Sequence, residues 1–458
     1  MSMHQIARTR FVSQIVGQAA LALFVFSSSA VAQPSGRGSA APTTLTFADA
    51  IDRGLRYNLG LIESTLTSAD ASAARLRALS ALRPTVSARA AQVYEDLALK
   101  EIGLTLPGLP ATTGGFGFQD FRVSVSQPIY NSELRNRYKS EQSAERASTL
   151  GARDAQDVVV LEVGTAYLQI VARAARLETA AAELRSAQEF DRQATDRVKA
   201  EVAPEIESLR AQVERQTAEQ QVINARNDLE KGKLVLARII GLPIEQPFDV
   251  EASVAYRPLS GISEESANAG ALRSRADLAS AAAAIDASDF EVRARHAQLE
   301  PTVGLSADYG AGGALPHMNQ VYTVAAGVTM PLYTGGRIRA DVLTAQNTLA
   351  RRRAEYEDLK RRVAFDVRTA WLDLTASDSG VAVAERNKQL AYRAETQALD
   401  RYANGVTNYL EVVQAREAVA QADETLVASL YAFHVAKLTL ARAIGDSSTT
   451  AKELFRHD

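Results

Sequence analysis

The chain has 458 residues, 46% of them hydrophobic and 23% charged, and its 51 Lys+Arg against 54 Asp+Glu give a formal net charge of -3. This balance disfavours nucleic acid as the main partner, because neutralising phosphates needs a basic excess. The absence of cysteine excludes disulfides, thiolate metal sites, a cysteine nucleophile and a thioether-linked lipid, and the five histidines show no metal-ligand spacing, so we expect no metal and no cofactor.

The N-terminal segment 1–32 has the pattern of a secretory signal peptide. Arg8 and Arg10 precede a short apolar run, and Ala-Val-Ala at 30–32 forms a cleavage site. We therefore expect export, with an N-terminal extension over 33–43. No later stretch reaches ~20 consecutive apolar residues, so we expect no spanning helix, although membrane β-strands would escape this test.

The chain carries an internal repeat. Residues 128–130 and 331–333 both read Pro-(Ile/Leu)-Tyr, and both halves end in Ile-Gly. Fixed spacing between several such blocks is typical of repeated architecture. The first repeat is predicted over 44–241, with strands at about 84–94 and 120–129 and long helices at 132–202 and 205–240. The second repeat is predicted over 263–445, with strands at about 301–310 and 321–332 and long helices at 337–404 and 407–444. A linker over 242–262 joins the repeats, and a C-terminal tail follows over 446–458.

Four segments alternate between apolar and small or polar residues. Val303, Leu305 and Ala307, for example, alternate with Gly304 and Ser306. This period indicates β-strands, and their length suffices to cross a bilayer when tilted, although a half-buried soluble sheet alternates in the same way. Four strands cannot close a barrel, so a membrane location would require copies to share one. Twelve strands from three copies would enclose a water-filled bore.

Two segments predict helices longer than a globular core needs. The segment 132–202 contains no proline and is about 70 residues long, which as a helix spans on the order of 100 Å. Within it, Val159, Val163 and Ile170 belong to an apolar seam spaced for a partner helix, so we expect an antiparallel coiled coil with its return helix. Trp371 occupies the seam position that corresponds to Tyr167, and we expect it to pack.

These features together resemble the TolC-like outer membrane efflux protein family, also called outer membrane factors. Residues 45–51 and Asn58 are similar to the family's first helix, 271–278 to its counterpart in the second repeat, and the resemblance covers nearly all of 43–446. It implies a mixed α and β fold of mainly long helices. In that fold a trimeric α-barrel, a helical coiled-coil tunnel, continues into a shared 12-stranded transmembrane β-barrel.

The resemblance also implies a function. Members form the outer-membrane exit duct of a tripartite efflux pump or type I secretion system, with a large periplasmic portion. A periplasmic adaptor (membrane fusion protein) and an inner-membrane transporter are the implied partners, and the homotrimer conducts small molecules or polypeptides passively, with no catalytic residue. Many relatives carry a lipid on an N-terminal cysteine, which this chain lacks.

The turns between the long helices and their return helices are the expected periplasmic mouth. In the second repeat Gly405 opens the turn and an acid follows at Glu411; in the first, Glu201 replaces the glycine and Pro204 supplies the break. Three copies of each carboxylate around one axis would attract cations, whereas the plainer interpretation is solvated charge at a helix start. The predicted entrance or gate residues are Glu205, Glu207, Asn408, Tyr409, Glu411 and Gln414, and the predicted adaptor contacts are Glu201, Val202, Pro204, Gly405, Val406 and Thr407.

Two other interpretations compete with the duct. A soluble periplasmic coiled-coil adaptor would explain export and long helices, but it needs neither four strands of bilayer length nor two full repeats. A filament-like coiled coil would have no strand blocks. An enzyme is not expected, because the sequence shows no Ser/His/Asp set and Gly335-Gly336 lacks the Lys-Ser/Thr of a phosphate loop. The cargo is not predicted.

Overall fold

The computed structural model divides the chain into two units, Met1–Ala41 and Pro42–Asp458. The structure describes residues 43–99, 103, 107–108, 110–251, 256–258, 263–314, 316–407, 409–445 and 447, all within the second unit. The predicted signal peptide, nearly all of the predicted extension and tail, and Asn408 lie outside the described residues.

Helices form most of the described chain, and local capping explains where several of them begin. The Thr46 hydroxyl accepts a hydrogen bond from the Asp49 amide at 3.1 Å, and Asn131 accepts one from the Leu134 amide at 2.9 Å. The helices are α2 (Phe47–Tyr57), α3 (Leu59–Ser80), α4 (Ser132–Lys199), α5 (Glu205–Ile239), α6 (Glu264–Ser274), α7 (Ala276–Ala297), α8 (Arg337–Ala403) and α9 (Tyr409–Ile444).

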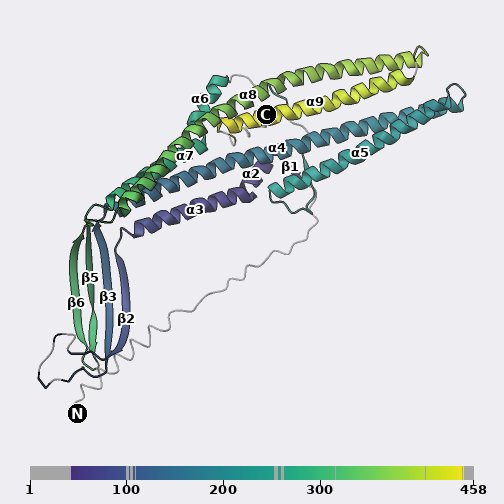
Figure 1. Cartoon of the computed structure of the whole chain (residues 1–458). Helices are drawn as coiled ribbons and strands as arrows, with labels where there is room; N and C mark the ends of the chain where they lie inside the picture. The colour runs from purple at the N-terminus through teal and green to yellow at the C-terminus, as the bar shows by residue number, and fades with distance from the viewer. Residues whose placement is uncertain are drawn as a thin grey trace. The chain divides into compact units, whose positions relative to one another are not determined.

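Four long strands form one antiparallel sheet in the order β2-β3-β5-β6, so β2 and β6 are its edges (Figure 1). Two short strands, β1 (Thr43–Leu45) and β4 (Phe248–Val250), pair in parallel elsewhere. Each half of the chain thus runs through two helices, two strands and two long helices. The strands of the sheet are β2 (Thr85–Glu95), β3 (Phe116–Tyr130), β5 (Thr302–Ala314) and β6 (Asn319–Thr329).

The two central strands are longer than we expected. β3 begins at Phe116 rather than near 120, and β5 ends at Ala314 rather than near 310, because Phe118 pairs with Ala314 across segments whose glycines suggested loops. β6 ends at Thr329, earlier than the expected 332. Pro331 has no N–H to donate to a ladder, which is consistent with that early end.

The register sorts the sheet into an apolar face and a polar face. Val123 pairs with Tyr309 on the apolar face, whereas Ser124 pairs with Asp308 on the polar face. The apolar face is open in the single chain; Val324 on β6, for example, is 70% exposed. An uncovered apolar face of this length is typical of a surface that contacts a membrane or another protein.

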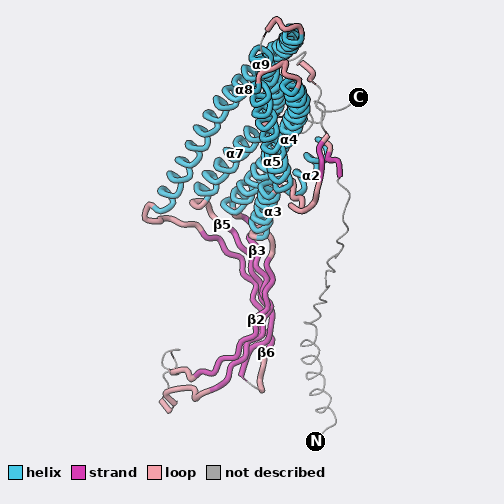
Figure 2. Tube along the Cα trace, turned by 90° about the vertical axis from the view of Figure 1, so that its right-hand side faces the viewer, coloured by secondary structure: helices cyan, strands magenta, loops and turns pink. Residues whose placement is uncertain are grey.

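The helices pack side by side in a fixed sequence. Near the sheet α3 lies against α4, α4 against α7 and α7 against α8; farther along, α5 lies against α4, α4 against α9 and α9 against α8 (Figure 2). One core cluster buries Tyr167 together with Val159, Val163 and Ile170, the three residues named above for the predicted seam. A second cluster buries Val367 and Leu374, and Trp371 packs against it.

Each of the helices α4 and α9 contains an 18-residue window that is apolar enough to cross a membrane, by length and composition. From the sequence we expected no spanning helix, because no run of consecutive apolar residues is long enough. In each window 44% of the residues are buried inside the structure. These helices also supply buried residues to the core clusters, so their apolar content is explained by packing between helices.

Candidate functional site

The α4–α5 and α8–α9 turns have the same backbone geometry. Gly405 adopts a positive φ of 69°, and Glu201 adopts 57° at the corresponding place in the first turn. In both, the next residue closes the helix end, with the Val202 amide donating to the Arg197 carbonyl and the Val406 amide to the Arg401 carbonyl. Glu201 therefore holds a left-handed conformation that glycine adopts without strain, at a cost of roughly 1 kcal/mol.

Each of the two turns carries an apolar side chain that is exposed to solvent. Val202 is 66% exposed and Val406 is 67% exposed. On α5, Ile206, Leu209 and Val213 continue an exposed apolar stripe from Val202. Exposed apolar side chains grouped in this way mark contact surfaces.

A small aromatic cluster joins the two hairpins just behind these turns. Phe190 of α4 lies 5.4 Å from Tyr409 of α9, measured between ring centroids, and Tyr402 of α8 lies 6.2 Å from Tyr409. Tyr409 and Val412 are buried against Ala194 and Ala211 of the other hairpin. The two hairpins are thus held together near their tips by packing as well as by polar contacts.

A polar contact between the two hairpins near the turns, Tyr402 with Glu207, is here named the tip latch. The Tyr402 hydroxyl donates to the Glu207 carboxylate at 3.0 Å, and the Arg197 guanidinium lies 4.8 Å from the centre of the Tyr402 ring. Burial, followed by the hydrogen bond to Glu207, raises the pKa of Tyr402. The tip latch joins α8 to α5, and the phenol remains protonated and able to donate at physiological pH.

A second set of contacts is here named the arginine latch: Tyr409, Glu214, Arg416, Glu395 and Ser186. The Tyr409 hydroxyl donates to Glu214 at 2.6 Å. Burial, together with this hydrogen bond, raises the pKa of Tyr409. Arg416 lies 3.4 Å from Glu214, 3.6 Å from Glu395 and 2.9 Å from the Ser186 hydroxyl. Its guanidinium also lies 4.1 Å from the centre of the Phe190 ring. One arginine therefore contacts side chains of α4, α5 and α8 from its place on α9.

The predicted entrance residues have different surroundings. Glu207 and Tyr409 belong to the two latches. Glu411 is paired within its own hairpin, because the Thr407 hydroxyl donates to it and Arg401 lies 3.5 Å away. Glu205 and Gln414 are exposed. The structure thus brings two of the predicted residues into the contact between hairpins. Sequence reasoning missed Tyr402, Glu214, Glu395 and Arg416, which lie far apart in the chain.

A third polar region joins α4 to α8 and α9 closer to the sheet. Burial first, and then the charges of Asp423 and Glu424, raise the pKa of Glu183. Cations offset part of this negative charge: Lys388 lies 2.8 Å from Asp423, and Arg176 lies 2.7 Å from Glu424. The Tyr392 hydroxyl donates to Asp423 at 2.8 Å. Glu183 is thus an acid between the hairpins whose negative charge the neighbouring cations compensate only in part.

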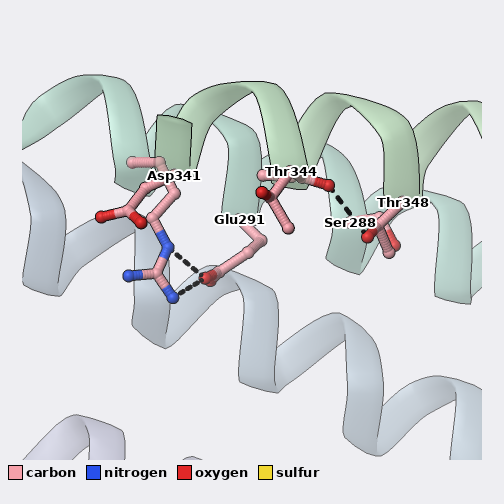
Figure 3. Close-up of a pocket in the computed structure, with 7 residues that line it drawn as sticks. Ser288, Glu291, Asp341, Thr344 and Thr348 are labelled. Atoms are coloured by element: carbon pink, nitrogen blue, oxygen red, sulfur yellow. Dashed lines mark hydrogen bonds and ion pairs between the residues drawn. The ribbon is translucent and has the colours of Figure 1, made fainter. Parts of the chain in front are cut away.

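Elsewhere, a polar groove of about 280 Å³ lies between α7 and α8. Figure 3 shows Ser288 and Glu291 of α7 across from Asp341, Thr344 and Thr348 of α8. Arg295 pairs with Glu291 at 2.7 Å, within α7 itself. The Ser288 hydroxyl donates to the Ala284 carbonyl of its own helix. No group of three or more His, Asp or Glu residues in the described part of the chain could hold a metal ion.

Comparison with known proteins identifies the family to which this architecture belongs. The sequence pattern of the family described as "Outer membrane efflux protein" matches residues 112–242 and 269–446, more than half of the chain. The chain is 24% identical over 340 residues to the outer membrane efflux protein BepC of Brucella suis, covering 73% of this chain and 72% of BepC. It is also 24% identical over 318 residues to the alkaline protease secretion protein AprF of Pseudomonas aeruginosa, covering 68% and 66%.

The fold is similar to solved outer-membrane channels. The outer membrane protein VceC of Vibrio cholerae superposes with a TM-score of 0.74 at 18% identity, covering 87% of this chain and 96% of VceC. Members of the matched family are ducts of efflux and secretion systems located in the outer membrane, with a periplasmic portion, and are not enzymes. The chain, with its sheet of four long strands and its long helical hairpins, belongs to the outer membrane efflux protein family, and it is a TolC-like exit duct.

Proposed function

We propose that three copies of the chain assemble into one duct, whose twelve-stranded transmembrane β-barrel continues into a trimeric α-barrel. The sheet is the observation that supports this most directly. Its strands are 11 to 15 residues long, its apolar face is uncovered, and both β2 and β6 are open edges. Open edges in lipid leave backbone groups unsatisfied at several kcal/mol each, so the edges of neighbouring copies pair. Twelve strands leave a water-filled bore.

The helices support the same assembly. Within the chain, α3 and α5 lie at one side of the row of helices and α8 at the other. Exposed apolar side chains line both sides, including Leu209 and Val213 on α5 and Phe365 and Leu390 on α8. One side of a copy therefore packs against the opposite side of the next, a head-to-tail contact that closes into a ring.

The two halves act as internal repeats in this arrangement. Residues 44–241 and 263–445 each contribute two strands to the barrel and one long hairpin to the tunnel. Residues 242–262 link them, and the signal peptide 1–32 directs export. Three chains thus provide six hairpins of similar structure. In the proposed tunnel these six hairpins occupy nearly equivalent positions around one axis.

The hairpin tips form the periplasmic entrance and contact the adaptor, which couples the duct to an inner-membrane transporter. Val202 and Val406 present apolar surface for this contact, and Glu201, Pro204, Gly405 and Thr407 shape the turns that carry them. Relatives named for efflux, alkaline protease secretion and cation efflux fit a duct whose cargo is chosen by its transporter. The tip and arginine latches hold the two hairpins of each chain together and keep the entrance closed until the adaptor binds.

Planar-bilayer recording tests the duct directly. The mature chain, extracted in mild detergent without dissociation, should insert and give steps of passive current with a linear dependence on voltage. The same preparation dissociated by heat should give none. Absence of current from the undissociated preparation, and from a variant with both latches removed, would contradict the proposal.

A further inference from the structure

The polar face of the sheet carries two arginines in one cross-strand pair. Arg89 of β2 stands directly opposite Arg122 of β3. Register places Asp120 of β3 and Asp308 of β5 on the same face. Apart from Asp308, the positions on β5 and β6 that share this face are uncharged; Gly310 stands opposite Arg122, and Val321 follows on β6. The arginines are the only basic side chains of the four strands, and both lie on this face, which carries Val93 and Phe118 toward one end.

Only one of the two arginines is neutralised. The Arg122 guanidinium lies 2.6 Å from Asp120 and 3.6 Å from Asp308. Arg89 is exposed, and no ion pair or hydrogen bond of its side chain is found among the residues that the structure describes. Like charges directly opposite each other are destabilising in a sheet. Within the described part of the chain the charge of Arg89 therefore has no acid paired with it, although two acids lie on the same face.

A neighbouring copy cannot supply the missing acid from its edge strand. In the shared barrel β2 of one copy pairs with β6 of the next, and β6 (Asn319–Thr329) contains no Asp or Glu. This holds for every register of the two edges. Along β2 itself the nearest acid is Glu95, six residues away, or about 20 Å. That separation is about 2.5 times the Debye length at physiological ionic strength, so Glu95 has little effect at Arg89.

We propose that the three copies of Arg89 form an anion-binding ring inside the barrel, which contacts carboxylate or phosphate groups of passing cargo. Guanidinium groups bind both by paired hydrogen bonds, and rings of basic side chains favour anions in pores. The ring lies in the barrel and is distinct from the acidic side chains at the tips. This inference rests on the proposed shared barrel, which turns the polar face toward the bore.

A single reporter cysteine measures the potential beside the ring, because the chain has no cysteine of its own. Ser87 lies two residues from Arg89 on the same face, about 7 Å away. In Ser87→Cys, a negatively charged methanethiosulfonate should react faster, relative to a positively charged one, than in Ser87→Cys with Arg89→Gln. The ratio of the two rates should fall roughly three- to eightfold on loss of Arg89, the upper value without salt screening.

Two further variants make the charge assignment specific. Arg89→Lys should retain most of the ratio, and Arg77→Gln, which removes an exposed arginine of α3 outside the sheet, should leave it unchanged. Inorganic phosphate should lower the ratio when Arg89 is present and have no effect with Arg89→Gln. An unchanged ratio after Arg89→Gln, or the same effect of phosphate in both, would overturn the proposal.

A cysteine on the opposite face separates this failure from failure of the duct. Ala90→Cys lies on the apolar face and should resist both charged reagents in membranes, while Ser87→Cys reacts. If Ala90→Cys reacts as fast as Ser87→Cys, the sheet is not in a bilayer and the proposed function fails. If Ala90→Cys is protected but Arg89→Gln leaves the ratio unchanged, only the anion-binding ring is wrong.

Discussion

Removing one hydroxyl from the arginine latch should open the duct. Tyr409→Phe deletes the 2.6 Å hydrogen bond to Glu214 and leaves the buried ring in the aromatic cluster. A hydrogen bond to a charged group contributes about 1.5–3 kcal/mol. Since Arg416 still pairs with Glu214, we expect the lower part of this range, which shifts the closed-to-open equilibrium of each chain by roughly 10-fold.

Single-channel conductance in planar bilayers is the assay. The wild-type duct should rest mainly at low conductance, and Tyr409→Phe should raise the fraction of time at high conductance. Arg416→Ala should raise it further, because it removes contacts to three helices. Tyr431→Phe is the matched control, an identical change on α9 at a partly buried residue for which no hydrogen bond is found within the described residues. Equal behaviour of Tyr409→Phe and Tyr431→Phe would refute the latch.

Three other predictions concern the same region. Glu201→Gly should stabilise the chain by roughly 1 kcal/mol through relief of its positive φ, seen as a higher thermal midpoint, whereas Gly405→Ala should lower it; a lower midpoint for Glu201→Gly would contradict this. Because the folded state raises the pKa of Glu183, it binds more protons than the unfolded state, so stability should fall as pH rises from about 4.5 through the raised pKa. Glu183→Gln should weaken this dependence, and the exposed Glu178→Gln should not; equal pH profiles would exclude Glu183 as a source. Glu411→Ala should weaken block by divalent cations added at the tip side, and Gln414→Glu should strengthen it; unchanged block in both would remove these positions from the entrance.

The sequence predicted those features that depend on local patterns. Long helices follow from segments without proline, and the α4–α5 turn follows from Pro204 and from Glu201 at the place of a glycine. The strand alternation predicted the apolar and polar faces. The ends of β3 and β5 were wrong because glycine suggests loops, whereas pairing with a neighbouring strand extends both.

The latches depend on contacts that no local pattern contains. Tyr402 and Glu207 are 195 residues apart, as are Tyr409 and Glu214. Helical periodicity predicts which residues face a partner helix, but not which helix that partner is. Glu207 and Tyr409 were proposed from their place near the turns, whereas Arg416, farther along α9, gave no signal beyond one charge among many. Its importance follows only from its contacts to three other helices, α4, α5 and α8.

The mass of the mature protein extracted from outer membranes in mild detergent, corrected for bound detergent, tests the shared barrel most directly. Three chains in one particle from the outer-membrane fraction is the predicted result. Four strands per chain then give twelve strands and no open edge. A soluble monomer or dimer would contradict the duct, because the two edges of the sheet would then lie in water and need no neighbouring copy.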